Sequence, residues 1–483
     1  MKNPGDFTTT DETAGPEDQR TTDFVCLGFV VFWCPEQPTR TGAFIPVVSD
    51  ATGRPQIMGR GGQLPTDEYP RLEAQRQRPG ANLPLGPFES PALSRVQLHV
   101  TSTTAGTLEL VNVGKCALLV NGAPSQRAQV RPGDLVELGR QLTLLCVERP
   151  LRLKGAAGLE QDGFGEPDQY GIVGESPSVW ELRSTIAAIG AREGHVLILG
   201  GSGTGKELIA RAVHRESKVR GPFVARNAGT LPESLIDAEL FGSAKGYPNA
   251  GMPERPGLIG AAHGGSLFLD EIAELPIAAQ THLLRVLDAG EYQRLGETTT
   301  RRSEFRLIAA TNQPENALRP DVHARFTFRI QAADLARRRE DTALLARYLL
   351  KKMAREDETV AARYFTEEGE PRLGASFVRG LASHPFPNNV RELRNLLWQA
   401  AIAGEGPALE WQDTQRRSAA ETEAGDNPTA DSPLNSGALQ DALDRHNGSI
   451  DKTWRALGLA NRFALMRLVK KHGLEIRKAS TRR

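Results

Sequence analysis

The sequence predicts a multidomain chain with a β-sandwich first, an α/β domain with a parallel sheet in the middle and an all-α helix-turn-helix at the end. Three observations predict this order: short strand-like runs separated by turn residues, strand-like and helical segments that alternate, and a basic helical segment. A length of 483 residues is also too great for one hydrophobic core. We therefore expect a disordered tail, the sandwich, a linker, the α/β domain, a second linker and the helical domain, over residues 1–22, 23–150, 151–169, 170–404, 405–437 and 438–483.

The composition is that of an ordinary soluble protein, with 39% hydrophobic and 24% charged residues. No apolar run is long enough to span a bilayer, and the first residues contain no apolar signal core, so we expect a cytoplasmic protein without a membrane partner. The formal net charge is zero, yet residues 445–483 hold eleven Lys and Arg against two acids. This basic end predicts a polyanionic partner.

The sandwich is predicted from short strand-like runs bounded by turns. Residues 1–22 before it are polar and acidic, which is typical of disorder. Turn pairs such as Asn121-Gly122 separate the runs, which cover residues 29–33, 44–47, 96–100, 107–111 and 142–147. Four cysteines at no metal-ligand spacing are interpreted as small buried or half-buried side chains: Cys26, Cys34, Cys116 and Cys146.

A glycine-rich segment after the apolar run 196–199 is the strongest chemical signal in the middle domain. It reads Gly-Gly-Ser-Gly-Thr-Gly-Lys over residues 200–206. The apolar run is typical of a buried parallel strand, and the glycines let backbone N–H groups turn inward around phosphate oxygens. Lys206 would add a positive charge at the β- and γ-phosphates, beside the N-terminus of the next helix. The competing interpretation is a glycine-rich turn beside a buried strand.

A second apolar run, at residues 267–269, ends in the two carboxylates Asp270 and Glu271. One carboxylate can hold Mg²⁺ and the next can polarise an attacking water. A glycine motif of this length also occurs by chance, whereas an acidic strand at this distance from it favours a nucleoside triphosphate site.

Several further segments follow in a fixed order between residues 171 and 404. They are Pro-Phe-Val-Ala-Arg-Asn at 222–227, Glu-Leu-Phe-Gly at 239–242, Gly-Gly-Ser-Leu-Phe-Leu-Asp-Glu-Ile at 264–272, Leu-Leu-Arg-Val-Leu at 283–287, Ala-Ala-Thr-Asn at 309–312 and Pro-Asn-Asn-Val-Arg-Glu-Leu at 387–393. This series resembles the AAA+ domain of the sigma-54-dependent transcriptional activators, or bacterial enhancer-binding proteins. The resemblance implies a P-loop ATPase with a helical lid, which uses ATP and Mg²⁺.

The resemblance also assigns roles to matching residues. Because Glu207 follows the lysine where other P-loops have Ser or Thr, metal binding would fall mainly on Asp270. Glu271 resembles the catalytic base, and Asn227 resembles the asparagine that holds this base. The implied ATP contacts are Gly200, Gly201, Ser202, Gly203, Thr204, Gly205, Lys206 and Glu207 in the Walker A segment, Ile172 and Val173 beside adenine, Thr311 and Asn312 as sensor I, and Arg391 as sensor II.

Arg319 and Arg325 match the two arginines that in this family reach into the neighbouring subunit's site as arginine fingers. A guanidinium there would stabilise the charge that spreads over the transferring phosphoryl group. Such arginines imply a closed head-to-tail ring, commonly a hexamer in this family. The alternative is ordinary surface charge.

One family motif is altered. The loop Gly-Ala-Phe-Thr-Gly-Ala, which contacts the sigma factor in the family, is Gly-Tyr-Pro-Asn-Ala-Gly at residues 246–251. Pro248 and Asn249 replace the contacting Phe and Thr, and proline restricts the backbone. Either the loop works through Tyr247, or the protein regulates without remodelling sigma-54; the substitutions favour the second interpretation. The residues implied in ATP hydrolysis are all present.

The first domain resembles a forkhead-associated domain, a reader of phosphothreonine peptides, over residues 23–150. Arg60, Ser94 and Arg95 match that family's phosphate-binding positions, and such groups suit a dianionic phosphate. There are two departures: Gln97 replaces a supporting histidine, and Cys116-Ala117 replace an Asn-Gly pair that contacts the peptide. The alternative is a sandwich that docks or controls a ring without binding phosphate.

The end of the chain resembles a Fis-type DNA-binding domain. Helical segments separated by turns at residues 447–449 and at Gly458 form a helix-turn-helix pattern, with the recognition helix expected at 461–472. The candidate DNA contacts are Asn461, Arg462 and Arg467, with Lys470 and Lys471 contacting phosphate alone. The alternative is a basic amphipathic helix that packs on a partner.

Together these predictions describe an ATP-hydrolysing, DNA-binding transcriptional regulator. The expected partners are DNA at an enhancer or promoter-proximal site, further copies of the chain in a ring, sigma-54 RNA polymerase and a phosphothreonine protein. The first alternative is a sigma-54-independent regulator or repressor that uses ATP to set its oligomeric state. A second alternative is a remodelling ATPase without a promoter role, whose basic end would have no preferred DNA site.

Overall fold

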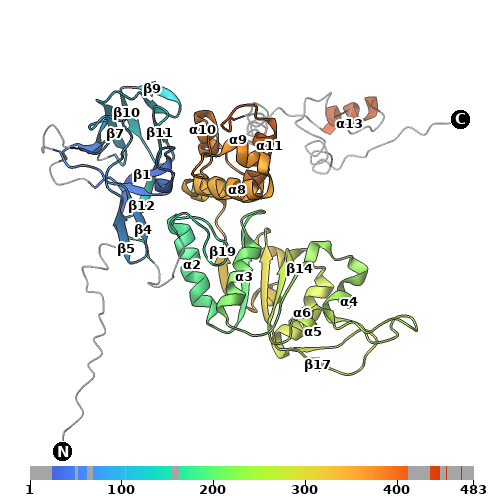
Figure 1. The fold of residues 1–483 in the computed structure, drawn as a ribbon. Coiled ribbons are helices and arrows are strands. Elements are labelled where there is room, and N and C mark those ends of the chain that lie inside the picture. The colour runs from blue at the N-terminus through green and yellow to red at the C-terminus, as the bar shows by residue number, and fades with distance from the viewer. Residues whose placement is uncertain are drawn as a thin grey trace, which may run out of the picture. The chain divides into compact units, whose positions relative to one another are not determined.

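The computed structural model describes residues 24–48, 53–62, 69–103, 105–154, 163–411 and 436–446, together with residues 453 and 469. The chain divides into two compact units, Met1–Arg416 and Arg417–Arg483. Figure 1 shows the elements of both units. The short 3-10 helices of the first unit are η1 (Pro38–Arg40), η2 (Ala228–Thr230), η3 (Glu233–Leu235), η4 (Ile272–Glu274), η5 (Glu315–Ala317) and η6 (Leu335–Asp341).

Two antiparallel sheets form a β-sandwich at the start of the first unit. The larger sheet has the strand order β5-β4-β2-β1-β12-β11-β8-β9, and the smaller sheet has the order β10-β7-β6-β3. Both sheets contribute to one apolar core, for example Phe29 and Leu144 from the larger sheet and Leu98 and Leu110 from the smaller. The five strand-like runs of the sequence overlap β1, β2, β6, β7 and β12. The strands are β1 (Val25–Trp33), β2 (Phe44–Pro46), β3 (Gln56–Met58), β4 (Gln75–Arg78), β5 (Ala81–Pro84), β6 (Leu98–Ser102), β7 (Leu108–Asn112), β8 (Leu118–Val120), β9 (Ala123–Ser125), β10 (Arg127–Val130), β11 (Leu135–Leu138) and β12 (Leu142–Pro150).

A five-stranded parallel sheet with the order β14-β15-β18-β13-β19 forms the middle domain. Its side chains alternate between two apolar layers, because successive residues of a strand point to opposite faces. Val196 and Ile198 pack with α2 and α3, whereas Leu197 and Leu267 pack with α4, α5 and α6, and Figure 1 shows these helices on either side of the sheet. The elements are α2 (Pro177–Gly190), β13 (His195–Leu199), α3 (Lys206–Glu216), β14 (Phe223–Asn227), α4 (Ile236–Phe241), α5 (Gly257–Ala261), β15 (Ser266–Asp270), α6 (Ile277–Ala289), β18 (Arg306–Thr311), α7 (Pro320–His323) and β19 (Phe326–Gln331), with a hairpin of β16 (Glu291–Tyr292) and β17 (Arg301–Arg302).

Four helices follow the sheet and form a lid: α8 (Thr342–Glu356), α9 (Glu358–Tyr364), α10 (Ala375–Ser383) and α11 (Asn389–Ala403). The lid continues beyond residue 404, where the sequence predicted a linker. Leu409 is fully buried among the lid helices, and its N–H donates to the carbonyl of Arg372 at 3.0 Å. The folded lid therefore includes residues 405–411.

The larger sandwich sheet is apolar on both of its faces. Along β1, Phe29 and Val31 point into the sandwich core, whereas Val30 and Phe32 belong to the apolar cluster of the lid helices. The same alternation holds for Leu144 and Leu145 in β12. An antiparallel sheet with one face in water alternates apolar and polar residues, so burial of both faces requires a cover. The lid supplies that cover.

Polar contacts accompany this shared sandwich–lid core. Arg379 of α10 donates two hydrogen bonds, at 3.0 and 2.9 Å, to the carboxylate of Glu137 in β11, which is 3% exposed. Gly42, in the turn after β1, has a φ of +89°, and a Cβ there would lie 2.7 Å from Leu344 of α8. A side chain at this position would push the lid away, because the glycine turn lies directly against it.

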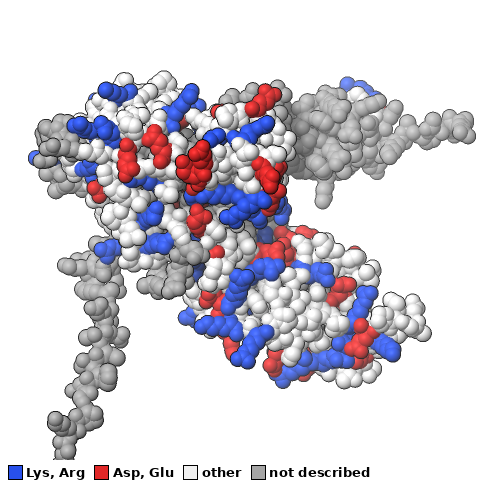
Figure 2. All heavy atoms as spheres, viewed as in Figure 1, with Lys and Arg blue, Asp and Glu red and all other residues white. Residues whose placement is uncertain are grey.

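In the second unit, the described part of the chain includes α13 (Ser436–Arg445), with Leu439 and Leu443 buried. The expected DNA contacts lie outside the described residues: Asn461, Arg462, Arg467, Lys470 and Lys471. On the face shown in Figure 2, basic and acidic side chains are interspersed over the described surface. The expectation of a polyanionic partner therefore still depends on the sequence of residues 445–483. Among the described helices, none is both long and apolar enough to cross a membrane.

Candidate nucleotide-binding site

The glycine-rich segment forms a tight loop between β13 and α3. The N–H of Gly200 donates to the carbonyl of Thr311 at 3.3 Å, and Gly205 directly precedes α3 with a φ of +100°. That left-handed conformation suits glycine, because other residues would be strained there. A Cβ on Gly203 would clash with the carbonyl of Asn388, so the lid approaches the loop closely. This is the strand, loop and helix that the sequence predicted.

Lys206 occupies the floor of this loop and is only 7% exposed. Its Nζ donates to the carbonyls of Gly200 and Gly201 at 3.1 and 3.3 Å, and lies 3.5 Å from Oε1 of Glu271. The ammonium group is thus held between the loop and the acidic strand. A cation at this position can neutralise the terminal phosphates of a nucleotide.

Asp270 and Glu271 stand together at the carboxyl end of β15. Burial raises the pKa of Asp270, and the negative charge of Glu271 raises it further. Oε2 of Glu271 accepts a hydrogen bond from the N–H of Asn312 at 3.1 Å. Two adjacent carboxylates in a half-buried site suit a divalent cation, which neutralises the pair, and their oxygens are ligands that Mg²⁺ prefers.

Asn227 ends β14, directly beside Asp270 in the register of the sheet, and its side chain lines the pocket. Among these described residues, no hydrogen bond joins Asn227 to Glu271, whose carboxylate contacts Asn312 and Lys206. The structure therefore places the expected asparagine at the site without the contact to the glutamate. Its role in holding the base stays a prediction.

The pocket around these residues has a volume of about 570 Å³ and lies between the sheet and the lid. Three carboxylates line it: Glu207, Asp270 and Glu271. Five basic side chains also line it: Lys206, Arg338, Lys352, Arg391 and Arg394. The excess of positive charge suits a polyphosphate, and the apolar end beside Ile172 and Val173 suits a flat base.

A buried ion pair holds the segment that carries Ile172 and Val173. Nε of Arg183 lies 3.0 Å from Oδ2 of Asp168, and its two Nη groups donate to the carbonyls of Gly174 and Ile172 at 2.8 and 3.0 Å. Oδ1 of Asp168 accepts from the N–H groups of Tyr170 and Ile172, each at 2.9 Å. Residues 163–169, predicted as part of a linker, thus include Asp168, which fixes the segment of Ile172 by hydrogen bonds.

Of the three expected sensor residues, Arg391 lines the pocket, whereas Thr311 and Asn312 do not. Arg391 of α11 lines the pocket, and its Nη1 donates to Oγ of Ser202 at 3.1 Å. Thr311 is fully buried at the end of β18, and its Oγ1 accepts from the N–H of Gln313 at 3.0 Å. Asn312 contributes its backbone N–H to Glu271. The lid arginine therefore contacts the phosphate-binding loop, and Asn312 contacts Glu271 through its backbone, whereas the hydroxyl of Thr311 binds Gln313.

The two arginines predicted as fingers lie outside the described lining of this pocket. Arg319 donates to both carboxylate oxygens of Asp321 at 3.0 and 2.6 Å, and to Oγ1 of Thr281 at 2.8 Å. Arg325 lies 2.5 Å from the carboxylate of Asp288 and its side chain is 46% exposed. Neither guanidinium lines the pocket of its own chain, and the role of the two arginines as fingers stays a prediction.

Sequence motifs did not reveal the lid side chains that complete the pocket. Arg338, Tyr348, Lys352 and Arg394 line it from η6, α8 and α11. The only signal for Arg338 was a run of three arginines at residues 337–339. The others are ordinary positions of amphipathic helices, and only the closure of the lid over the loop brings them to the site.

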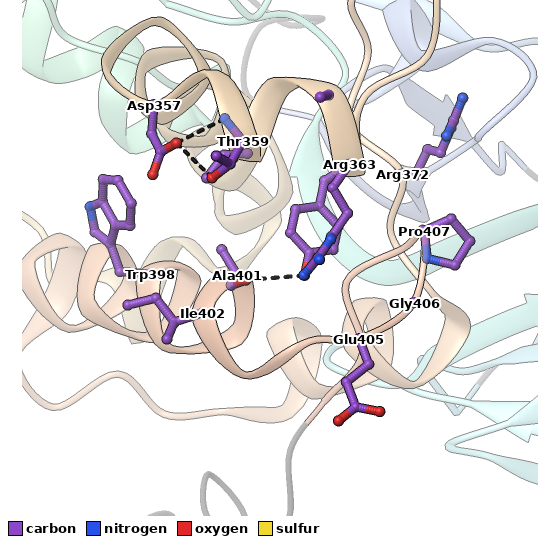
Figure 3. Close-up of a pocket in the computed structure, with 13 residues that line it drawn as sticks. Asp357, Thr359, Arg363, Arg372, Trp398, Ala401, Ile402, Glu405, Gly406 and Pro407 are labelled. Carbon is purple, nitrogen blue, oxygen red and sulfur yellow. Dashed lines mark hydrogen bonds between the residues drawn. The ribbon is translucent and has the colours of Figure 1, made fainter.

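A second hollow, of about 750 Å³, lies on the lid and is shown in Figure 3. Its polar groups are used to hold helix ends. Asp357 caps α9 by accepting from the N–H and Oγ1 of Thr359 at 2.8 and 2.7 Å (Figure 3). Arg363 donates to the carbonyl of Gly404 at 2.9 Å. The rest of the wall includes Ile402, which is 79% exposed. Since these groups do not converge on one point, the nucleotide pocket remains the candidate site.

In the sandwich, the three predicted phosphate contacts come together. The N–H of Arg60 donates to the carbonyl of Ser94 at 3.0 Å, and Arg95 follows it at the surface. Oγ of Ser94 accepts from the N–H of Lys115 at 2.9 Å. Gln97, in place of a histidine, is fully buried and its Oε1 accepts from the N–H of Ser94 at 3.1 Å.

The same glutamine supports the turn that lacks the Asn-Gly pair. Nε2 of Gln97 donates to Oδ1 of Asn112 at 2.8 Å and to the carbonyl of Cys116 at 3.0 Å. It thereby joins the segment of Ser94 to the segment of Cys116. Whether this domain belongs to the forkhead-associated family stays a prediction.

The altered loop at residues 246–251 folds back on the hairpin of β16 and β17. The N–H of Gly246 donates to the carbonyl of Met252 at 2.9 Å, and the bond between Tyr247 and Pro248 is cis. The ring of Tyr247 lies so close to Gly296 that a Cβ there would be 2.6 Å away. Tyr247 and Met252 each remain 40% exposed. The loop thus presents two half-exposed apolar side chains on a closed turn.

Comparison with known proteins agrees with this geometry. A family model described as the sigma-54 interaction domain matches residues 172–336, and one described as the AAA+ ATPase lid domain matches residues 336–431. The fold and the site therefore define an AAA+ ATPase, a class that uses ATP with Mg²⁺ as the usual partner ion.

Individual relatives extend the match over most of the chain. The regulatory protein AtoC of Escherichia coli is 32% identical over 370 residues, which cover 72% of this chain and 77% of AtoC. The nitric oxide reductase transcription regulator NorR1 of Cupriavidus necator is 38% identical over 317 residues, which cover 63% of this chain and 58% of NorR1. A crystal structure of NtrX from Brucella abortus in complex with ATP, at 30% identity, covers 63% of this chain and 69% of that chain with a TM-score of 0.45. The chain belongs to the sigma-54 activator family of transcriptional regulators.

Proposed function

We propose that this protein is an ATP-hydrolysing, DNA-binding transcriptional regulator that assembles into a ring and acts on sigma-54 RNA polymerase. One observation carries the proposal: the phosphate-binding loop, the acidic strand and a lid arginine converge on one pocket, while two arginines face away from it. We infer that a second copy of the chain would bring these two arginines to the pocket.

Within one subunit, the residues divide the work of hydrolysis. Lys206 and the backbone of residues 200–205 hold the phosphates, and Asp270 would hold Mg²⁺, which offsets the negative charge of the phosphates. The carboxylate of Glu271, oriented by the N–H of Asn312, accepts a proton from the attacking water. The hydrogen bond from Arg391 to Ser202 joins the lid to the phosphate-binding loop, so a bound phosphate can change the position of the lid.

Between subunits, Arg319 and Arg325 would act as the arginine fingers of a head-to-tail ring. Their partners Asp321 and Asp288 hold them at the surface in the single chain. Rings with such shared sites close by rotational symmetry, and six copies are the number we propose here. The chain's basic end at residues 445–483 would place this ring on an enhancer or promoter-proximal DNA site.

The sandwich is proposed as the input domain, reading a phosphothreonine peptide through Arg60, Ser94 and Arg95. These residues belong to the rim formed by β3 and the segment before β6, whereas the larger sheet faces the lid. A peptide can therefore bind without displacing the lid. Because the sandwich and lid share a core, we propose that peptide binding at the rim is communicated to α11, the helix that carries Arg391 and Arg394.

A second function is favoured by the altered loop. Pro248 and Asn249 replace the residues that in the family contact the sigma factor, and the closed turn leaves Tyr247 and Met252 as its exposed apolar groups. Under this alternative the protein binds DNA and regulates transcription without sigma-54, using ATP to set its oligomeric state. The two functions share the ATPase site and differ at the loop.

The test is transcription in vitro with sigma-54 polymerase, on a promoter linked to a DNA site selected by the full-length protein. We expect an ATP-dependent transcript that Lys206→Ala abolishes, and that Tyr247→Ala reduces while ATP turnover stays unchanged. If the wild-type protein turns over ATP and binds its site yet yields no transcript, the sigma-54 proposal is excluded and the alternative stands.

Phosphopeptide recognition is tested by measuring the affinity of the full-length protein for phosphothreonine peptides from a degenerate library. Arg60→Ala and Arg95→Ala should each weaken binding by about 10- to 100-fold, because each removes a charge-assisted hydrogen bond. Arg127→Ala is the matched control, since Arg127 pairs with Glu109 on β7 and is exposed. Equal affinity for unphosphorylated peptides would instead indicate a sandwich that docks without reading phosphate.

A further inference from the structure

Arg338 is a buried cation at the base end of the nucleotide pocket. It lies in η6, the segment between β19 and the lid, where its φ of −129° and ψ of 46° interrupt the helical turn. Its side chain is 7% exposed and lines the pocket together with Ile172, Val173 and Tyr348. The same segment approaches the base end at its last residue, because Oδ2 of Asp341 would lie 2.8 Å from a Cβ on Gly174.

The guanidinium of Arg338 is not satisfied by the protein. Its Nε has no hydrogen-bond partner among the described residues, and the structure describes no ion pair for this side chain. Asp341 is the acid that attracts it most, yet the Asp341 carboxylate already accepts from the N–H groups of Glu175 and Ser176 at 2.8 and 3.0 Å and from Oγ of Ser176 at 2.5 Å.

Two other buried arginines of the domain, Arg183 and Arg306, have several acceptors each. Arg183 pairs with Asp168 and donates to two carbonyls of the segment at the base end. Arg306 donates to the carbonyls of Ile189, Gly190 and Gly194 at 3.0, 3.1 and 2.8 Å. A buried charged donor that lacks such partners is costly. Arg338 therefore lacks the acceptors that Arg183 and Arg306 have. Its Nε is shielded from solvent, so an acceptor in the pocket would reach the guanidinium through its two Nη groups.

We propose that Arg338 binds the nucleoside part of ATP and is a determinant of nucleotide affinity at this site. The phosphates belong to the opposite end, where Lys206 and the start of α3 lie. A guanidinium only donates hydrogen bonds, and the nucleoside offers it acceptors in the adenine ring nitrogens and the ribose oxygens. The inference rests on ATP use at this pocket.

The experiment compares Mg-ATP with Mg-tripolyphosphate, which lacks the nucleoside, as ligands of the full-length protein. Arg338→Met should weaken ATP binding by about 10- to 100-fold, the range for a hydrogen bond to a charged group, and leave tripolyphosphate binding within about threefold. Arg338→Lys should retain part of the ATP affinity. An equal loss for both ligands, or an unchanged ATP affinity, would overturn the proposal.

Lys206→Ala tests the nucleotide site itself in a protein that keeps Arg338. This variant should bind both Mg-ATP and Mg-tripolyphosphate more weakly than the parent protein does. Arg306→Met is the matched fold control: it removes an equally buried guanidinium distant from the pocket, so the ratio of the two affinities should not change. Stability of each variant is followed by thermal unfolding.

Nucleotide analogues test the same contact in the unmodified protein, even if Arg338→Met does not fold. The deaza-ATP analogues each lack one ring nitrogen, and 2′-deoxy-ATP and 3′-deoxy-ATP each lack one ribose hydroxyl. The analogue that lacks the contacted atom should bind about tenfold or more weakly than ATP. The Arg338→Lys variant should bind this analogue as tightly as the parent protein does, because the contact that the substitution weakens is already absent. If the parent protein binds all the analogues as tightly as ATP, Arg338 does not contact the nucleoside.

Discussion

Replacing Glu271 by glutamine should lower the rate of ATP turnover by about 10²- to 10⁴-fold and leave the affinity for ATP within about threefold, since general bases contribute rate factors of this size. Glutamine has the shape of glutamate, and its side-chain oxygen can still accept from the N–H of Asn312, which lies 3.1 Å from the carboxylate. It cannot take a proton from water at neutral pH. Turnover is measured by phosphate release, and affinity by titration with a fluorescent ATP analogue.

Glu304→Gln is the control for this substitution. Glu304 is exposed and pairs with Arg302, outside the nucleotide pocket. Its replacement should alter neither turnover nor affinity. A Glu271→Gln protein that hydrolyses ATP at the wild-type rate would show that another group activates the water, and Asp270 would then be the next candidate.

The second large effect is expected for Arg325→Ala, which should lower turnover by about 10³-fold or more without loss of ATP binding, as expected for an arginine finger. In the single chain, Arg325 lies against Asp288, outside the pocket. Its loss would therefore be felt in a neighbour's site. A mixture of Arg325→Ala and Lys206→Ala proteins should regain turnover, because the second variant binds no nucleotide but offers an intact Arg325 to the first.

A mixture of Glu271→Gln and Lys206→Ala proteins is the matched control for recovery. The phosphate loop and the base belong to the same subunit, so no subunit of this mixture holds a complete set and turnover should stay low. If the Arg325→Ala mixture also stays inactive, the arginine acts within its own chain and the shared-site ring is wrong.

The sequence predicted those parts of the site that are continuous along the chain. The strand, loop and helix around Lys206 could be predicted because the apolar run, the glycines and the lysine follow one another along the chain. The acidic strand was found for the same reason. The family match confirms the AAA+ class and the use of ATP. The roles of the individual residues stay predictions.

The rest of the pocket depends on contacts between distant segments. Arg338, Tyr348 and Lys352 carry no motif, and only the packing of the lid against the sheet brings them to the nucleotide. Asn227 and Glu271 were expected to touch, yet in the described structure Glu271 contacts Lys206 and Asn312 instead. Such side-chain choices are decided by small energy differences among several available partners, which a sequence pattern does not contain.

The sandwich shows a similar limit. Val25–Trp33 is an almost unbroken apolar run, and in an antiparallel sheet such a run indicates that both faces are covered. It does not say what covers the second face. The polar segment at residues 163–169 was predicted as a linker on composition, yet Asp168 and Gly165 are fixed by hydrogen bonds to the rest of the unit.

The shared core of sandwich and lid limits which domains of this protein can be removed or replaced by domains of other proteins. A shortened chain that begins after residue 154 would expose Leu344, which lies against Gly42 of the sandwich, together with other apolar lid side chains of the shared core. We therefore expect the isolated ATPase domain to aggregate in solution. Swapping in a foreign sensor would require a matching set of lid helices. Sandwich, lid and parallel sheet should therefore be engineered together, because the lid also supplies Arg391 and Arg394 to the nucleotide pocket.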